Sequence, residues 1–113
     1  MINSIGSTIA GLSVHAKKVE TIAHNVANVN TDGFKKDRVT ILSNESGFPE
    51  AHISKIKTPG YTIQSPEGEI ESSNVDLAEE IINMTVGKNG YKANLKVLEG
   101  EKEVFDSVLD ILA

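Results

Sequence analysis

Two apolar heptad repeats, one at each end of the chain, constrain this sequence more than any other feature. In the N-terminal part, apolar residues alternate at spacings of three and four from Ile2 to Val26 without a break. The C-terminal part repeats this pattern from Leu77 to Leu112, with two lysine interruptions. Such spacing places apolar side chains along one face of an α-helix, as in coiled coils. We therefore predict two long helices that pair as a coiled-coil-like hairpin.

The apolar heptad positions of both helices, here called the seam, are expected to be buried within one subunit or between two. The seam includes Ile5, Ile9, Leu12, Val19 and Val26 on the first helix and Ile81, Met84, Tyr91, Leu95, Leu98, Phe105 and Leu109 on the second. The first helix would be about 40 Å long and the second about 55 Å, so the shorter cannot cover the longer. Uncovered apolar surface favours contact with another subunit. On the repeats alone, a hairpin within one chain is the simpler explanation.

The segment between the repeats has β-strand character. Short β-prone or partly alternating runs occupy residues 39–43, 51–57 and 60–65. Turn sequences follow the second and third runs, at Pro59-Gly60 and from Pro66 to Gly68. We therefore predict a small antiparallel sheet or hairpins between the helices, which makes the fold class α+β.

The changes of pattern at the two junctions set the expected domain boundaries. Residues 1–33 and 72–113 would form a discontinuous helical domain, and residues 34–71 would form a small β-rich projection. The second helix can begin after one of three capping residues, Ser72, Ser73 and Asn74.

Composition excludes several classes of function. A chain of 113 residues favours one domain, and its net charge of −5 argues against nucleic acid as the main partner. The absence of cysteine rules out disulfides and thiolate sites. No run of 18 apolar residues could span a membrane, and no basic stretch with an apolar core indicates a cleavable signal peptide.

Motifs for catalysis or metal binding are also missing. His15 and His24 are nine residues apart, which places them on opposite faces of a helix rather than at a metal-binding spacing of four. No glycine-rich phosphate loop follows a strand, and no serine or threonine lies in a nucleophile motif. We therefore predict no catalytic, cofactor-binding or metal-binding residues and no enzyme activity.

Residues 24–34, HNVANVNTDGF, closely resemble the N-terminal signature of the flagellar rod, hook and hook-associated axial proteins. The matching residues are Ala27, Asn28, Thr31, Gly33 and Phe34. The C-terminal part resembles the other signature of that family, through Ser73, Asn74, Val75, Asp76, the Glu80 region, Met84, Tyr91, Ala93, Asn94 and Val97. Each motif is moderately specific, and both together in the right order are a strong resemblance.

The resemblance implies a structural subunit of the bacterial flagellar basal-body rod, whose terminal helices pack into the inner tube. About 40 residues separate the signatures, which is most similar to the short proximal rod proteins. Its partners would be other rod subunits, copies of itself and the flagellar export apparatus, with no cofactor and no small-molecule substrate. It would reach the periplasmic rod without a cleaved signal peptide. The alternatives are a soluble coiled-coil adaptor or export chaperone and, with no supporting motif, a small enzyme.

The sequence departs from that family just before Tyr91, where Gly87 and Gly90 replace helix-favouring residues. Each glycine costs a helix interior about 1 kcal/mol relative to alanine. This predicts a bend in the second helix, or a helix that is ordered only in the assembly.

The first signature is expected to redirect the chain from the first helix into the β-rich part. Asn28 and Asn30 would bond carbonyls at the helix end or take left-handed backbone angles. Gly33 would have a positive φ, and Phe34 would anchor the returning chain.

Overall fold

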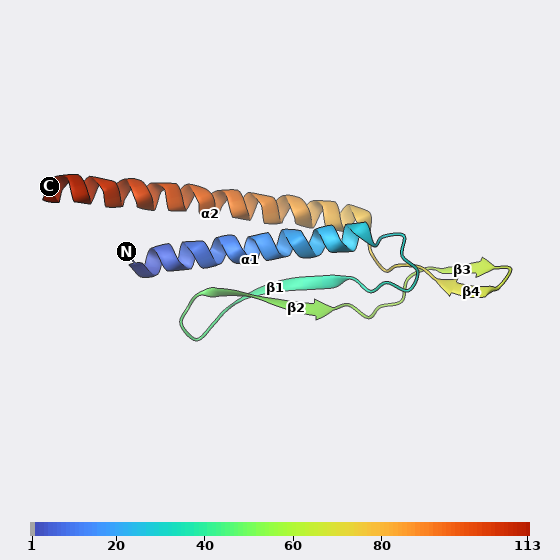
Figure 1. Ribbon diagram of the computed structural model, residues 1–113. Coiled ribbons are helices and arrows are strands. Elements are labelled where there is room, and N and C mark those ends of the chain that lie inside the picture. The colour runs from blue at the N-terminus through green and yellow to red at the C-terminus, as the bar shows by residue number, and fades with distance from the viewer. Residues whose placement is uncertain (1) are drawn as a thin grey trace.

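The computed structural model describes residues 2–113, and the seam position Ile2 has its side chain outside the described part. The helices are α1 (Ile2–Ala27) and α2 (Leu77–Leu112), and the strands are β1 (Asp37–Ser43), β2 (Pro49–Lys55), β3 (Thr62–Ser65) and β4 (Gly68–Glu71). Two long terminal helices thus enclose a small antiparallel β segment in the sequence (Figure 1). The predicted α+β fold class is confirmed.

α1 and α2 run side by side in opposite directions, as the predicted helical hairpin requires (Figure 1). At one end of the pair, Ser4 and Thr8 donate hydrogen bonds to the Glu101 carboxylate, and the Thr8 bond is 3.3 Å long. At the other end, Asn25 Nδ2 lies 3.3 Å from Glu80 Oε2. Polar side chains therefore join the two helices at both ends of their contact.

The middle of the helix pair is a close approach at glycines. A Cβ added at Gly90 would lie 2.4 Å from Cε1 of His15, and one added at Gly87 would lie 3.2 Å from Cγ2 of Val19. α2 is nevertheless continuous through both glycines, so the predicted bend is wrong. The glycines make room for α1, and this packing outweighs their poor helix propensity.

α2 extends past the end of α1 (Figure 1). The side chains of its last turns, residues 102–112, here called the overhang, are all exposed. Its exposed apolar residues are Val104, Phe105, Val108, Leu109, Ile111 and Leu112. The expectation that the shorter helix cannot cover the longer is confirmed.

β1 and β2 form an antiparallel hairpin that lies along α1, on the side opposite α2 (Figure 1). Across this hairpin Ile41 pairs with Ala51. The most buried apolar residues are on α1, where Val14 and Ile22 are each 5% exposed. α1 is therefore the middle layer, with α2 on one side and the hairpin on the other.

β3 and β4 form a second hairpin, which extends beyond the ends of the helices (Figure 1). Ser65 pairs with Gly68 across its turn. The predicted hairpins are confirmed, but only the second extends away from α1. The domain boundaries at residues 33/34 and 71/72 stay a prediction.

The second helix begins later than the capping prediction placed it. Its N-cap is Asp76, whose carboxylate accepts from the N–H groups of Ala78, at 3.0 Å, and Glu79, at 3.2 Å. The expected cap at residues 72–74 is therefore wrong. Ser73 Oγ instead accepts from the N–H of Val75, at 3.1 Å, within the turn that precedes the helix.

Candidate functional site

A buried asparagine joins three elements where α1 ends. Asn25 is 1% exposed, and its Nδ2 donates to the carbonyl of Asp37, at 2.8 Å, and to Glu80. Its Oδ1 accepts from the N–H of Asp37, at 3.0 Å. One side chain therefore fixes the start of β1 and the first turn of α2 against α1. The prediction missed Asn25, although a weak helix former inside a helical pattern is a signal that could have found it.

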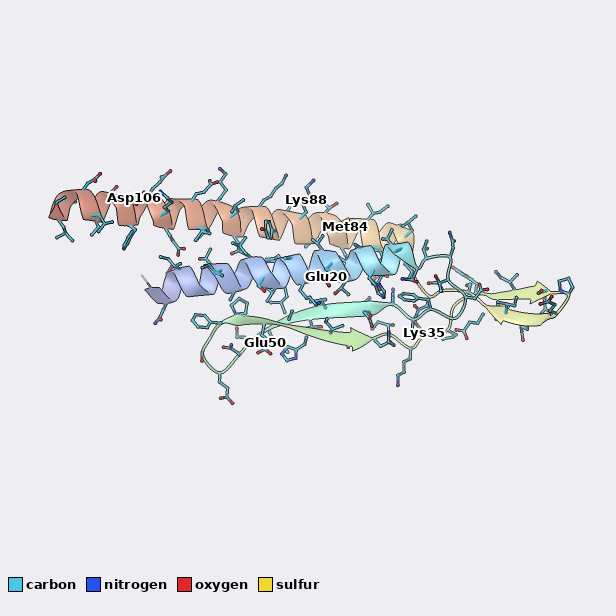
Figure 2. The ribbon with its side chains drawn as sticks, in the orientation of Figure 1. Glu20, Lys35, Glu50, Met84, Lys88 and Asp106 are labelled. Atoms are coloured by element: carbon cyan, nitrogen blue, oxygen red, sulfur yellow. The ribbon has the colours of Figure 1, made fainter. Side chains whose placement is uncertain are left out.

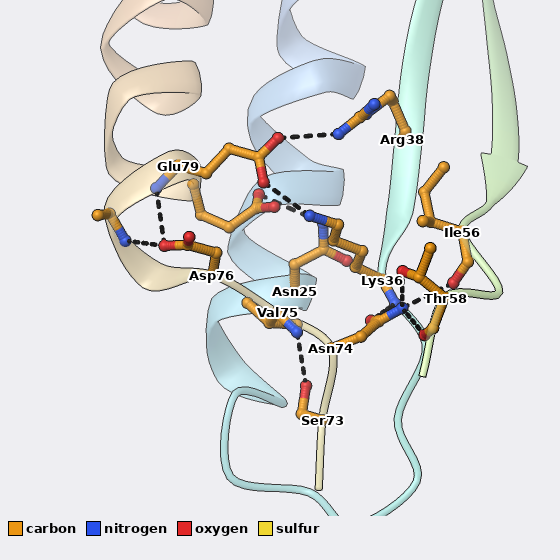
Figure 3. Close-up of polar contacts among 12 residues, drawn as sticks. Asn25, Lys36, Arg38, Ile56, Thr58, Ser73, Asn74, Val75, Asp76 and Glu79 are labelled. Carbon is orange, nitrogen blue, oxygen red and sulfur yellow. Dashed lines mark hydrogen bonds and ion pairs between the residues drawn. The ribbon is translucent and has the colours of Figure 1, made fainter. Parts of the chain in front are cut away.

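Asn74 plays a similar part just before α2 (Figure 3). Its Oδ1 accepts from the N–H of Lys36, at 2.7 Å, and its Nδ2 donates to the carbonyls of Ile56 and Thr58, at 2.8 and 2.9 Å. The Asn74 amide thus joins the segment before α2 to the backbone just before β1 and to the backbone just after β2. This is a structural reason for an asparagine in the C-terminal signature.

Glu79, in the first turn of α2, forms ion pairs with two basic side chains, one just before β1 and one within it (Figure 3). Nζ of Lys36 lies 2.7 Å from one carboxylate oxygen, and Nη2 of Arg38 lies 2.8 Å from the other. Lys36 is almost fully buried, which reduces the screening of its pair by water. The junction of α1, β1 and α2 is therefore held by polar contacts rather than by an apolar core.

The first signature contains a local network at the end of α1. Asn28 Nδ2 donates to the carbonyl of His24, at 2.9 Å, and its Oδ1 accepts from the Thr31 hydroxyl, at 3.0 Å. The predicted bond to a helix-end carbonyl is confirmed for Asn28. No residue other than glycine has a positive φ within residues 2–113, so Asn28 and Asn30 do not take left-handed angles.

The chain then turns at Gly33, whose φ of 69° confirms the predicted positive value. Its N–H donates to the carbonyl of Glu71, at 2.8 Å, which ties the turn to the end of β4. Phe34 follows, with its ring edge-on to His24 at a centroid distance of 5.6 Å. The carbonyl of Phe34 also accepts from the N–H of Asn74, at 3.2 Å, so backbone bonds and an aromatic contact together hold the returning chain.

Parts of both halves of the seam line one groove of about 710 Å³ between α1 and α2, here called the apolar groove. Its exposed lining is almost entirely apolar and comes from Ala16, Val19, Met84, Tyr91 and Leu95, with Glu20, Lys88 and Lys92 beside them. Figure 2 shows Met84 and Glu20 on neighbouring stretches of the two helices. The helices thus pair through small and polar residues and leave an apolar surface beside the contact.

Burial of the seam residues within the chain is incomplete. Those half-buried are Ile5, Leu12, Val19, Val26, Met84 and Leu98. Those exposed are Ile9, Ile81, Tyr91, Leu95, Phe105 and Leu109. Contact between these residues and another subunit stays a prediction. Of the second signature, Asn94 lies against Gly11 of α1, whereas Ala93 is exposed.

His15 lies in the helix pair with an unpaired buried nitrogen. Within the described residues, its Nδ1 has no hydrogen-bond partner, and neither has Oε2 of Glu101. Burial lowers the pKa of His15 from its ordinary value of 6.5, and the nearby positive charge of Lys18 lowers it further. The helix pair therefore favours a neutral imidazole.

Groups that could bind a metal ion are not gathered in the part of the chain that the structure describes, where no three His, Asp or Glu side chains cluster. Within the same residues, neither helix is long and apolar enough to cross a membrane.

Known proteins match both ends of the chain. Residues 8–35 match the family described as flagella basal body rod protein, and residues 67–111 match the family described as flagellar basal body rod FlgEFG protein C-terminal. The flagellar basal-body rod protein FlgC of Borreliella burgdorferi is 26% identical over 99% of this chain and 97% of that protein. The chain belongs to the flagellar rod and hook protein family.

Longer flagellar rod and hook proteins match over a smaller share of their length. The flagellar hook protein FlgE of Escherichia coli is 30% identical over 97% of this chain but 27% of that protein. The rod protein FlgG of Bacillus subtilis is 50% identical over 40 residues, which are 35% of the chain and 15% of that protein. The chain thus spans nearly all of FlgC but only about a quarter or less of these longer rod and hook proteins.

Proposed function

We propose that this member of the flagellar rod and hook family is a structural subunit of the bacterial flagellar basal-body rod. It assembles through its terminal helices with copies of itself and with other rod subunits. The similarity to FlgC over nearly the whole of both chains carries this proposal. The exposed apolar residues of α2 support it, because surface of this extent on a small rod-shaped protein is typical of subunit contacts.

Within this proposal, residues 1–33 and 72–113 form the axial helical domain, and residues 34–71 face outward. The signature turn from Ala27 to Phe34 redirects the chain between them. The subunit passes through the flagellar export apparatus without a cleaved signal peptide and works in the extracytoplasmic rod. It has no catalytic role, cofactor or small-molecule substrate. No observation favours the adaptor or chaperone alternative.

Substitution of Leu95 tests assembly through the seam. Leu95 lines the apolar groove and is 41% exposed, so aspartate there costs the free subunit little stability but places an unpaired charge in any contact that buries the groove. We expect Leu95→Asp to be produced and folded yet absent from purified basal bodies, with swimming lost in a complemented deletion strain.

Val86→Asp is the matched control. Val86 is also apolar and 54% exposed, but it is nine residues from Leu95, which turns it about half-way round the helix. This variant should enter basal bodies and restore swimming. Normal rods from Leu95→Asp would contradict assembly through the seam. A deletion strain with intact flagella would contradict the rod function itself.

A further inference from the structure

We propose that the overhang of one copy docks in the apolar groove of a second copy, so that subunits join head to tail. This inference rests on the proposed rod function and names the surfaces that would carry it. The apolar groove has one wall from α1, at Val19, and one from α2, at Met84, Tyr91 and Leu95. Two helical walls that both present heptad positions fit a third amphipathic helix.

The overhang has the length and the apolar face that the groove needs. The α2 wall from Met84 to Leu95 is about 16 Å long, and the overhang is a helix of about 15 Å. Phe105, Leu109 and Leu112 continue the seam along the overhang and are exposed. Figure 2 shows Asp106 on this part of α2, past the end of α1. The overhang of a chain cannot reach its own groove, because α2 is one continuous helix that supplies both surfaces.

Charge complementarity supports the same occupant. Lys88 and Lys92 flank the groove, and the overhang has an acidic stripe at Glu103, Asp106 and Asp110. Lys92 and Asp106 are fourteen residues apart, so they share a heptad position, each next to a seam residue.

Several of these charges are free to pair between copies. Within residues 2–113, no ion pair is formed by Lys88, Lys92, Glu103 or Asp110. Among the described residues, Asp106 pairs only with Lys102 of its own helix, at 2.6 Å. On the α1 wall, the negative charge of Glu20 is paired with Lys17, whose Nζ lies 3.2 Å from Glu20 Oε1. The charges would set the orientation of the docked helix more than its affinity.

Docking of this kind is heterologous, because two different surfaces of the chain meet. A docked pair still has an empty groove at one end and an undocked overhang at the other end. Such contacts extend into an open array unless their rotation closes a ring. A head-to-tail contact therefore fits a subunit of an elongated structure.

Disulfide crosslinking tests the contact cleanly, since the chain has no cysteine of its own. A Val19→Cys chain with a short tag is mixed with a Leu109→Cys chain with a long tag and oxidised mildly. The docked arrangement predicts a crosslinked heterodimer that becomes more abundant with concentration. Ser107→Cys replaces Leu109→Cys in the control, because Ser107 is exposed on another face of the same helix turn. The control should give several-fold less heterodimer.

Charge reversal tests the orientation. Lys92→Glu in the Val19→Cys chain, or Asp106→Lys in the Leu109→Cys chain, should each reduce crosslinking several-fold. Both changes together should restore it, since the pair is then reversed. Circular dichroism of each variant checks that its helices are intact.

Three outcomes would overturn the docking proposal: no heterodimer up to the solubility limit, equal crosslinking from Ser107→Cys, or preferred crosslinking of Val19→Cys to Gln64→Cys in the β3–β4 hairpin. Incorporation into basal bodies is scored separately. Normal incorporation without these crosslinks leaves the rod function standing and rejects the docking, whereas crosslinking without incorporation rejects the rod function.

Discussion

At the scale of single residues, the junction of α1, β1 and α2 depends on asparagine side chains that form the hydrogen bonds a neighbouring backbone would otherwise form. Asn25 pairs with both the N–H and the carbonyl of Asp37, much as a neighbouring strand would. A buried backbone group without a partner costs free energy. Asn25 therefore allows β1 to begin against a helix rather than against another strand.

Asn25→Ala should be the most damaging asparagine substitution in the first signature. It leaves both backbone groups of Asp37 and the buried Glu80 without their amide partner, which should lower the free energy of unfolding by about 3 kcal/mol. Asn28→Ala, which removes one bond to a helix-end carbonyl, should cost about 1 kcal/mol. Urea unfolding of the two variants measures the difference. Equal midpoints would show that the Asn25 bonds contribute no more than an ordinary cap.

Gly33 offers a prediction about the backbone alone. A Cβ there would meet no atom within 4 Å, so only the φ of 69° opposes a side chain. Gly33→Val should cost about 2 kcal/mol, because a β-branched residue is strained at positive φ, whereas Gly33→Asn should cost less than half of that. Thermal unfolding compares them. If asparagine is as damaging as valine, the turn is limited by space or by a neighbouring subunit rather than by φ.

At the scale of elements, the helix pair depends on small residues. Gly90→Ala should destabilise the chain, since its Cβ would lie 2.4 Å from the His15 ring. Gly100→Ala should stabilise it by up to about 1 kcal/mol, because nothing lies within 4 Å and alanine is the better helix former. In a His15→Ala background, Gly90→Ala should become neutral or stabilising. A double-mutant cycle by urea unfolding measures this coupling, and additive effects would contradict the contact.

His15 should make the helix pair sensitive to pH. Because its pKa is lower in the folded chain than the ordinary 6.5, the unfolded chain binds more protons below that pH. Its contribution to stability is therefore complete above about pH 6.5 and declines as the pH falls toward the lowered pKa. His15→Gln should flatten the stability profile in this window, as measured by urea midpoints at several pH values. An unchanged profile would assign the pH dependence to other groups.

The sequence predicted the elements better than it predicted their contacts. Heptad spacing was enough to place both helices, and the β-prone runs placed a β segment between them, although no run was predicted at β4. The close contacts at Gly87, Gly90 and Asn94 were not predicted, because apolar spacing alone does not detect them. Small residues let two backbones approach closely, and this preference leaves no apolar signal. The helix start was missed because Ser72, Ser73, Asn74 and Asp76 are all residue types that cap helices, and their order alone does not select one.

At the scale of the whole molecule, the chain is a rod, with principal extents of 77 × 26 × 15 Å. Among residues 3–113, few side chains are buried, and most of those are polar. The groove could not be predicted from the seam alone, since its form depends on which helix faces meet. Seam residues such as Leu95 and Tyr91 were chosen from the heptads and line the groove, and their burial by another subunit stays a prediction.

The free subunit should be unevenly ordered along α2. In dilute monomer, amides of the overhang should exchange quickly, because the side chains of residues 102–112 are all exposed. Amides near Glu80, which Asn25 contacts, should be protected. Assembly should then protect the overhang. Hydrogen exchange on verified monomer and on assembled material tests this, and strong protection across both 2–26 and 92–112 in the monomer would contradict it.

The long sequence separation of the α1–α2 contacts sets the order in which the chain can fold. Thr8 and Glu101 are 93 positions apart, whereas β1 and β2 close between Asp37 and Lys55. At a synthesis rate of roughly 5–20 residues per second, Glu101 emerges about 2–9 s after that hairpin is complete. Non-local contacts also form slowly, because their loops must close first. During synthesis, the hairpin is therefore the first partner that α1 meets, and α2 is the last.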